Sequence, residues 1–144
     1  MFRVEHSLFI ERPPAEVFAY TTDPEKLPEW QSTALEARSE GPVRQGAHVT
    51  EVRKFLGRRM ETDVEVTAYE QDRRFALKVV SGPVPFNFEQ TLEPSDGGTI
   101  VNSVLEAEPG GFFKLAEPLV ERAVRRQTQA DYEQLKDILE ARAS

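Results

Sequence analysis

The chain has 144 residues, and this length suits a single domain, residues 1–144, that buries about two-thirds of the surface it exposes when unfolded. Its formal net charge of −7 argues against a general nucleic-acid or anionic-membrane binder, because such proteins attract phosphates with a basic field. The absence of cysteine excludes disulfides, thiolate chemistry and cysteine-ligated metals, and it fits a reducing compartment.

Residues 2–11 alternate between apolar and polar side chains, which predicts a half-buried strand. Two acidic residues, Glu5 and Glu11, fall where a signal peptide needs an apolar run. No segment of the sequence approaches the roughly 18 apolar residues of a membrane helix. We therefore expect a soluble, cytoplasmic protein without an integral membrane segment. The residues on the inner face of the predicted strand are Phe2, Val4, His6, Leu8 and Ile10.

Two short helices are predicted next, because prolines stand where helices begin. Pro14 follows Pro13 and precedes an apolar run, and a proline at the first helical position needs no amide donor. Asp23 and Pro24 repeat the device, since the aspartate can cap the free amides of a second helix that ends near Trp30.

From residue 33 to residue 108 the apolar period is two, and turn signals recur. This pattern predicts about six further strands, and short connections favour antiparallel pairing because parallel neighbours need long crossovers. The main turn signals are Glu40-Gly41-Pro42, Gly57, Gln71-Asp72, Ser81-Gly82-Pro83 and Ser95-Asp96-Gly97-Gly98.

After Pro109-Gly110-Gly111 the apolar period becomes helical and continues to Leu139, which predicts one long C-terminal helix. Pro118 cannot donate to the helical hydrogen-bond ladder and crowds the preceding turn. We therefore expect a kink or a restart at Pro118, which would separate a segment over residues 112–117 that could gate a pocket.

This order of elements resembles the START-like, or SRPBCC, superfamily, and within it the polyketide cyclase/dehydrase and lipid transport group. The resemblance covers the whole chain and implies an α+β helix-grip fold. In that fold a curved seven-stranded antiparallel sheet packs on the long C-terminal helix, with two short helices after the first strand and a hydrophobic cavity between sheet and helix. The sharpest matches are residues 10–18 (IERPPAEVF), Asp23-Pro24, Trp30, and Leu92-Glu93-Pro94 with Gly97-Gly98-Thr99.

The residues also favour a cavity independently, because seven strands present more inward surface than one helix about 10 Å wide covers. Polar side chains fall in phase with apolar faces, and buried polar groups cost roughly 1–3 kcal/mol unless partnered. The expected ligand-binding residues are His6, Tyr20, Trp30, Val64, Val66, Leu77, Val79, Phe86, Phe88, Gln90, Phe112, Leu119, Ala123 and Gln127.

His6 and Asp131 are the candidate catalytic residues, and each has a structural alternative. His6 could be a core histidine partnered by Gln127 or Asp131. Asp131 could face solvent at the edge of the helical stripe, or pair with His6 or Arg53. Trp30 and the phenylalanines could be plain core or lid residues. The basic clusters around residues 53–59 and 122–126 could be solvated surface, or they could dock an acidic partner or a carboxylate ligand.

Three functions remain open at this point. The first is a carrier or sensor that binds a hydrophobic small molecule such as a lipid, an isoprenoid or an aromatic polyketide. The second is a polyketide cyclase/dehydratase-type enzyme that uses acid/base residues of the cavity. The third is a co-chaperone-like interaction module. No cofactor or metal is expected, because His6 and His48 lack metal-ligand spacing. No nucleic-acid partner is expected at this net charge. The protein is expected to be a monomer or a homodimer.

Overall fold

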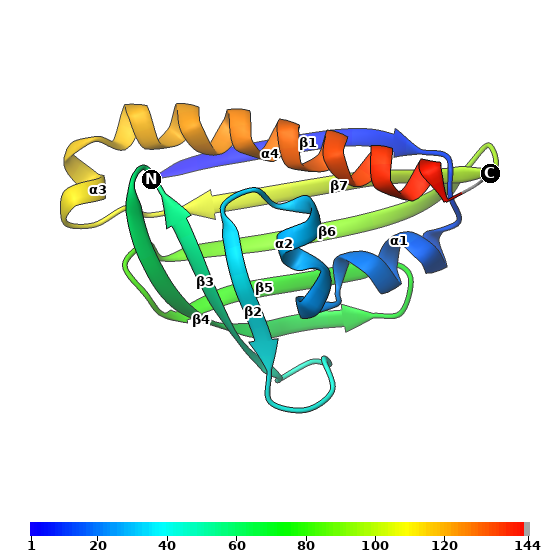
Figure 1. Cartoon of the computed structure of the whole chain (residues 1–144), viewed down its shortest axis with the longest axis horizontal. Coiled ribbons are helices and arrows are strands. Elements are labelled where there is room, and N and C mark those ends of the chain that lie inside the picture. The colour runs from blue at the N-terminus through cyan, green and yellow to red at the C-terminus, as the bar shows by residue number, and fades with distance from the viewer. Residues whose placement is uncertain (143–144) are drawn as a thin grey trace.

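The computed structural model describes residues 1–142 and, apart from the side chain of Phe112, all of their side chains. Strands predominate between an early group of short helices and a long final helix (Figure 1). In chain order the elements are β1 (Phe2–Ile10), α1 (Pro14–Thr21), the 3-10 turn η1 (Pro24–Lys26), α2 (Leu27–Trp30), β2 (Ala34–Ser39), β3 (His48–Phe55), β4 (Arg58–Glu70), β5 (Arg74–Ser81), β6 (Phe86–Ser95), β7 (Gly98–Ala107), α3 (Phe112–Leu115) and α4 (Glu117–Ala141).

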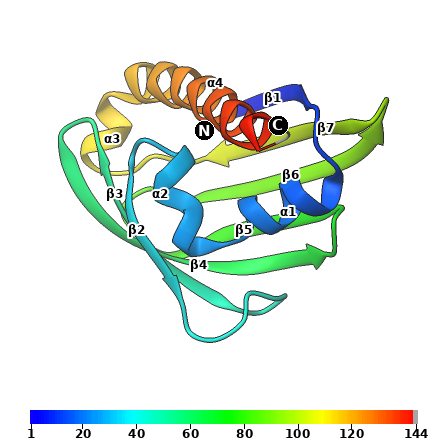
Figure 2. The same ribbon diagram turned by 45° about the vertical axis from the view of Figure 1, so that its right-hand side comes forward.

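The seven strands form one antiparallel sheet in the order β1-β7-β6-β5-β4-β3-β2. Strands β2 to β7 therefore make a meander, and β1 pairs with the last strand, with Phe2 opposite Ala107 and His6 opposite Ser103. The sheet curls so that α4 and α2 lie on its concave side (Figure 2). The predicted helix-grip fold, with its curved seven-stranded antiparallel sheet and long C-terminal helix, is confirmed.

Tight hairpins explain why the strands can follow one another so closely. In the β6–β7 turn, Asp96 has φ 43° and Gly97 has φ 79°, and two positive φ values match the right-handed twist of the flanking strands. Gly98 lies just beyond this turn, where a Cβ atom would come within 2.4 Å of the Ile10 carbonyl oxygen. Only glycine therefore allows β7 to approach the end of β1 this closely.

The short helices begin at the prolines that predict them. Pro14 opens α1, and Pro24 opens η1 directly after Asp23. The Asp23 carboxylate accepts a hydrogen bond of 3.0 Å from the backbone N–H of Glu25, which is the expected cap. Helix α2 follows η1 directly and brings Trp30 to the concave side of the sheet, where it is buried.

The C-terminal helical region restarts where Pro118 predicts it. Helix α3 ends at Leu115, and Ala116 leaves the helical conformation with φ −107° and ψ 24°. Pro118 then stands in the first turn of α4, where its missing N–H has no helical partner to lose. The restart leaves α3 as a separate turn of helix at one end of the sheet (Figure 1).

Two groups of buried apolar residues form the core. The larger group includes Phe18, Trp30 and Leu135 and joins α1, α2 and the C-terminal half of α4 to the sheet. The smaller group includes Phe2 and Val120 and lies at the α3 end. Among the described helices, none combines the length and apolar character that a membrane span requires.

Candidate functional site

A cavity of about 200 Å³ lies between the concave face of the sheet and α4, and residues of both core groups line it. Most of its wall is apolar, with aromatic rings from β5 and β6 and aliphatic side chains from α4. The charged lining residues come from β3 and the middle of α4, and uncharged polar side chains come from α1, the loop after α2, β6, β7 and α4. An apolar pocket with a few polar groups is the usual form of a small-molecule site.

Seven of the residues singled out in the sequence line this cavity. They come from α2, β5, β6 and α4, so the fold brings together positions that are up to about a hundred residues apart. The seven are Trp30, Leu77, Phe86, Phe88, Gln90, Gln127 and Asp131.

Other expected residues lie elsewhere. Val64 and Val66 are fully buried in the larger core group, where they contact other core side chains and do not line the cavity. Val79 is partly buried and packs against the same group. Leu119 is 55% exposed. Leu119 and Ala123 each precede a residue of α4 that lines the cavity. Because consecutive side chains of a helix point about 100° apart, these two side chains point away from the cavity. The side chain of Phe112 lies outside the described part of the structure.

Tyr20 is buried but does not line the cavity. Its hydroxyl donates a hydrogen bond of 2.8 Å to Glu29, and the guanidinium of Arg142 lies 5.0 Å from its ring centroid. Burial, together with the Glu29 carboxylate, raises the pKa of Tyr20 to about 12. These contacts give Tyr20 a structural position between α1, α2 and the C-terminus of α4.

A buried hydrogen-bonded chain connects β6, α1 and α4 at the inner wall. Gln90, which is 2% exposed, donates from its amide to the Thr21 hydroxyl at 2.8 Å. The Tyr132 hydroxyl donates to the Gln90 amide oxygen at 2.6 Å, and burial raises the pKa of Tyr132. Because each of these groups is partnered, the chain fixes the rotamers of the wall without a cost for unsatisfied polar groups.

A second polar group joins α4 to the loop after α2. The Asp131 carboxylate accepts hydrogen bonds from the backbone N–H of Ser32 at 3.2 Å and from the Gln127 amide at 2.8 Å. The same Gln127 amide donates to the Ser32 hydroxyl. Burial raises the pKa of Asp131, and these hydrogen bonds and the charge of Arg53 oppose that rise. Asp131 is thus buried at the wall and is not a solvent-facing residue.

An ion pair on β3 completes the polar wall. The Arg53 guanidinium donates to the Glu51 carboxylate at 2.9 Å, to the Thr33 hydroxyl at 3.0 Å and to the Gln31 amide oxygen at 2.7 Å. Glu51 is only 4% exposed, and both charged residues line the cavity. Glu51 is not among the residues that the sequence pattern predicts for the site, although Val49, Glu51, Arg53 and Phe55 alternate along one strand and therefore share its inner face.

His6 lies behind the cavity wall. Its ring stacks on Tyr132 with centroids 5.4 Å apart, and its Nδ1 is buried without a hydrogen-bond partner among residues 1–142. It does not line the cavity and has no hydrogen bond to Gln127 or Asp131, which bond to each other and to Ser32. Burial lowers the pKa of His6 from its ordinary value of 6.5, and the charge of Glu133 opposes that shift.

The lowered pKa of His6 predicts that this residue decreases the free energy of unfolding in acid. The unfolded chain binds the histidine proton more tightly, so the contribution of His6 is present above a pH of about 6.5 and is lost as the pH falls through the folded pKa. His6→Phe keeps a ring against Tyr132 and removes the titration. Urea unfolding at a pH of about 7.5 and about 5 is expected to show a smaller loss of stability for His6→Phe than for the wild type.

His48 offers the matched control for this experiment, because it is the second histidine of the sequence and is exposed on β3. His48→Phe makes the same change of side chain at this exposed position and is measured in parallel. If His6→Phe loses as much stability as the wild type between the two pH values, burial of His6 does not lower its pKa.

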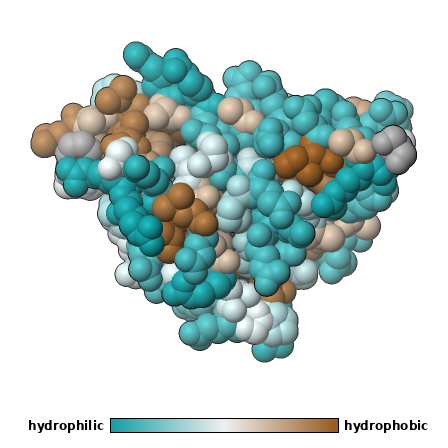
Figure 3. Space-filling model, viewed as in Figure 1, coloured by the Kyte–Doolittle hydropathy of each residue, from teal (hydrophilic) through white to brown (hydrophobic). Residues whose placement is uncertain are grey.

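The basic residues around the β3–β4 hairpin face in different directions. Arg53 faces the cavity, whereas Arg58 and Arg59 lie beside Lys114 along a shallow surface groove. Apolar surface gathers at this α3 end, as Figure 3 shows, and Leu115 is almost fully exposed there. On α4, Arg125 pairs with Glu121 and donates to the Arg3 carbonyl oxygen.

Within residues 1–142, no three histidine, aspartate or glutamate side chains gather in a way that could hold a metal ion.

Comparison with solved structures gives the same fold. A protein of Thermus thermophilus, TTHA0849, superposes with a TM-score of 0.86 at 18% identity over 99% of this chain and 100% of its own. The Zhui aromatase/cyclase of a Streptomyces species has a TM-score of 0.81 at 14% identity, over 99% of this chain and 96% of its own. Ara h 8.0201 has a TM-score of 0.71 at 16% identity, over 95% and 96% of the two chains.

The search of curated proteins returned no match. Residues 1–140, nearly the whole length of the chain, match the family described as polyketide cyclase / dehydrase and lipid transport. The sequence resemblance, the strand order and the cavity between sheet and helix all agree with this match. The chain belongs to the polyketide cyclase/dehydrase and lipid transport family.

Proposed function

We propose that residues 1–144 act as one ligand-binding domain that carries or senses a hydrophobic small molecule, such as a lipid, an isoprenoid or an aromatic polyketide. The observation that carries this proposal is the cavity of about 200 Å³, whose wall is mostly apolar and includes several polar side chains. Transfer of apolar ligand surface from water into such a wall is favourable by roughly 25 cal/mol per Å². The family description, which includes lipid transport, supports the same proposal.

The indole of Trp30 supports a ligand that also has a polar end. Trp30 is 3% exposed and lines the cavity, and its Nε1 has no hydrogen-bond acceptor in the described part of the chain. A buried N–H without an acceptor costs about 1–3 kcal/mol. A ligand oxygen that accepts this hydrogen bond would recover that cost and fix the orientation of the ligand.

Trp30 also supplies the experiment, because it is the single tryptophan of the sequence and its fluorescence reports on the cavity wall. Octanol, farnesol and naphthol represent the lipid, isoprenoid and aromatic classes. A saturable change of Trp30 emission with at least one of them is expected, together with co-purified small molecules in native mass spectra. Unchanged emission with all three probes and a ligand-free mass spectrum would rule out the proposal.

A cyclase or dehydratase activity is the second candidate, and Asp131 is the observation that favours it. Asp131 lines the cavity, and burial raises its pKa, which is a shift that general acids and bases of enzyme cavities often have. Tyr132 and Arg53 line the same wall. If this activity exists, aromatic polyketide precursors are converted by the wild type and more slowly by Asp131→Asn. Equal turnover by Asp131→Asn, or none by the wild type, would exclude this mechanism.

A further inference from the structure

The charges on the cavity wall indicate which kind of polar end group a ligand can have. Among the residues that the structure describes, three charged side chains line the cavity: Glu51, Arg53 and Asp131. Two of them are carboxylates and one is a guanidinium. The polar side of the cavity therefore has no excess of positive charge, and it stays without one when Asp131 is protonated, because Glu51 still balances Arg53.

Arg53 is already engaged with protein groups. Three of its N–H groups donate to Glu51, Thr33 and Gln31, at 2.9, 3.0 and 2.7 Å. Glu51 is almost fully buried, so its negative charge is not screened by water and lies directly beside the guanidinium. A ligand carboxylate that reaches Arg53 would meet the Glu51 carboxylate at the same place, and like charges that are close together in an interface repel each other strongly.

The wall is nevertheless suited to a group that both donates and accepts hydrogen bonds. Trp30 lines the cavity, and its buried Nε1 is a donor without an acceptor among residues 1–142. A guanidinium has five N–H groups, and Arg53 uses three of them. The carboxylates of Glu51 and Asp131 can accept from a ligand hydroxyl. A hydroxyl group satisfies donors and acceptors of this kind, whereas a carboxylate at neutral pH can only accept.

We infer that the cavity selects a neutral, hydroxyl-bearing apolar molecule over a carboxylate of the same chain length, with Glu51 as the residue that rejects the carboxylate. This selectivity rests on the proposed function, because it assumes that the cavity binds apolar ligands. Asp131 adds to the same discrimination from α4, where it is held by Ser32 and Gln127.

The test compares octanol, octanoate and octylammonium, which share one apolar chain and differ in the charge of the end group. Trp30 emission at neutral pH gives the three dissociation constants for the wild-type protein. Octanol is expected to bind at least about tenfold tighter than octanoate. Equal or tighter binding of octanoate overturns the inference, and tighter binding of octylammonium than octanol overturns the assignment to a neutral group.

Two substitutions test the cause. Glu51→Gln keeps an amide oxygen for Arg53 and removes the opposing charge, so it is expected to improve octanoate binding at least about tenfold and to shift the ratio of octanol to octanoate affinity toward octanoate. Asp131→Asn keeps the oxygen that accepts from Ser32 and Gln127, and it is expected to shift the ratio in the same direction by a smaller factor. Unchanged octanoate affinity in a folded Glu51→Gln protein contradicts the role of Glu51.

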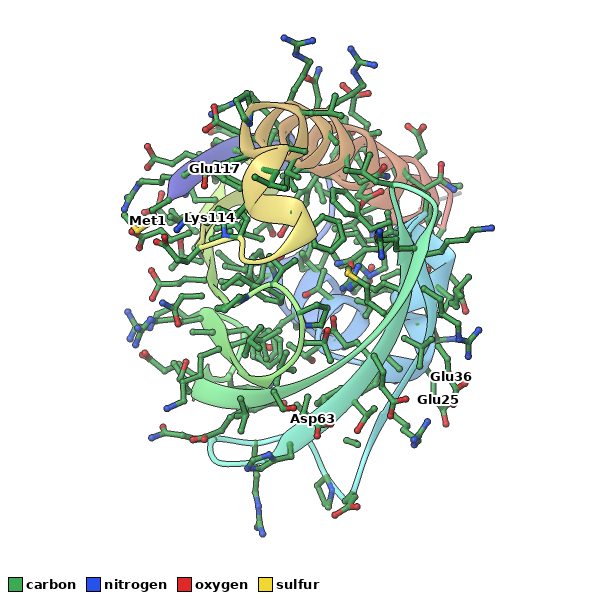
Figure 4. The ribbon with its side chains drawn as sticks, turned by 90° about the vertical axis from the view of Figure 1, so that its left-hand side faces the viewer. Met1, Glu25, Glu36, Asp63, Lys114 and Glu117 are labelled. Carbon is green, nitrogen blue, oxygen red and sulfur yellow. The ribbon has the colours of Figure 1, made fainter. Side chains whose placement is uncertain are left out.

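Matched controls come from the outer side of the sheet. Glu36 and Asp63 lie on that side, away from α4 (Figure 4), and both are exposed. Glu36→Gln and Asp63→Asn change the net charge as much as the two test substitutions, so they should leave the ratio of octanol to octanoate affinity at the wild-type value. If they shift it equally, the selectivity arises from net charge and not from the cavity wall.

Different results would contradict the ligand-binding function and the selectivity for a neutral end group. If all three probes bind with equal affinity, the proposed ligand-binding function stands and the selectivity is wrong. If none of the three changes Trp30 emission, the ligand-binding function itself fails and the selectivity fails with it. Where Glu51→Gln does not fold, Asp131→Asn and the wild-type comparison of octanol with octanoate still decide the inference.

Discussion

Leu135→Ala is expected to lower the free energy of unfolding by about 3–5 kcal/mol, because it removes a buried aliphatic side chain and leaves a hole at the centre of the larger core group. Leu135 lies on α4 and is 0% exposed. Its packing against the sheet fixes the depth at which the helix lies above the cavity. Urea unfolding followed by circular dichroism measures the loss.

The matched control is Leu119→Ala, which removes the same atoms from an exposed position of the same helix. It should change the free energy of unfolding by no more than about 0.5 kcal/mol. A loss below about 1 kcal/mol at Leu135, or equal losses at both positions, would contradict the orientation of α4 described above.

Val124→Phe is expected to weaken binding of octanol at least about tenfold, because the larger side chain enters the ligand space. Val124 lines the cavity from α4, and a volume of about 200 Å³ leaves little room for both a phenyl ring and a ligand. The protein should remain folded, with a stability change of about 1–3 kcal/mol, since the ring fills empty space beside partly buried neighbours. Isothermal titration calorimetry measures the affinity.

Leu119→Phe is the control for this substitution, because it introduces the same ring on the solvent side of α4. It is expected to bind octanol like the wild type. Should Val124→Phe bind as tightly as the wild type, the ligand occupies some other surface. Should both variants lose binding, the loss comes from a general effect on the helix.

The strand and helix pattern was predictable because local physics fixes it. Alternation over residues 2–11 identifies β1, Pro14 and Pro24 mark the starts of α1 and η1, and Pro118 marks the restart of the C-terminal helix. The register of β1 against β7 was not predictable, because it depends on long-range packing and on the close approach at Gly98 that a sequence pattern does not reveal.

The site was predictable only in part, because lining a cavity depends on the rotation of each element. Gln90 and Gln127 reach the cavity, whereas Leu119 and Ala123, one residue out of phase on α4, do not line it. Glu51 was missed because a charged residue in an alternating strand is usually assigned to the solvent face. Its place beside Arg53 follows from the inward phase of β3, which the pattern contained but which charge alone obscures.

Binding of an apolar ligand with a polar end beside Trp30 can be followed through the indole N–H resonance of that residue. Trp30 is the single tryptophan, so the resonance is assigned without ambiguity in a two-dimensional NMR spectrum of the labelled protein. On addition of octanol, this resonance and the side-chain amides of Gln90 and Gln127 are expected to shift together and to saturate at one ligand per chain. An indole resonance that stays in place while amides on the outer side of the sheet shift would contradict binding beside Trp30.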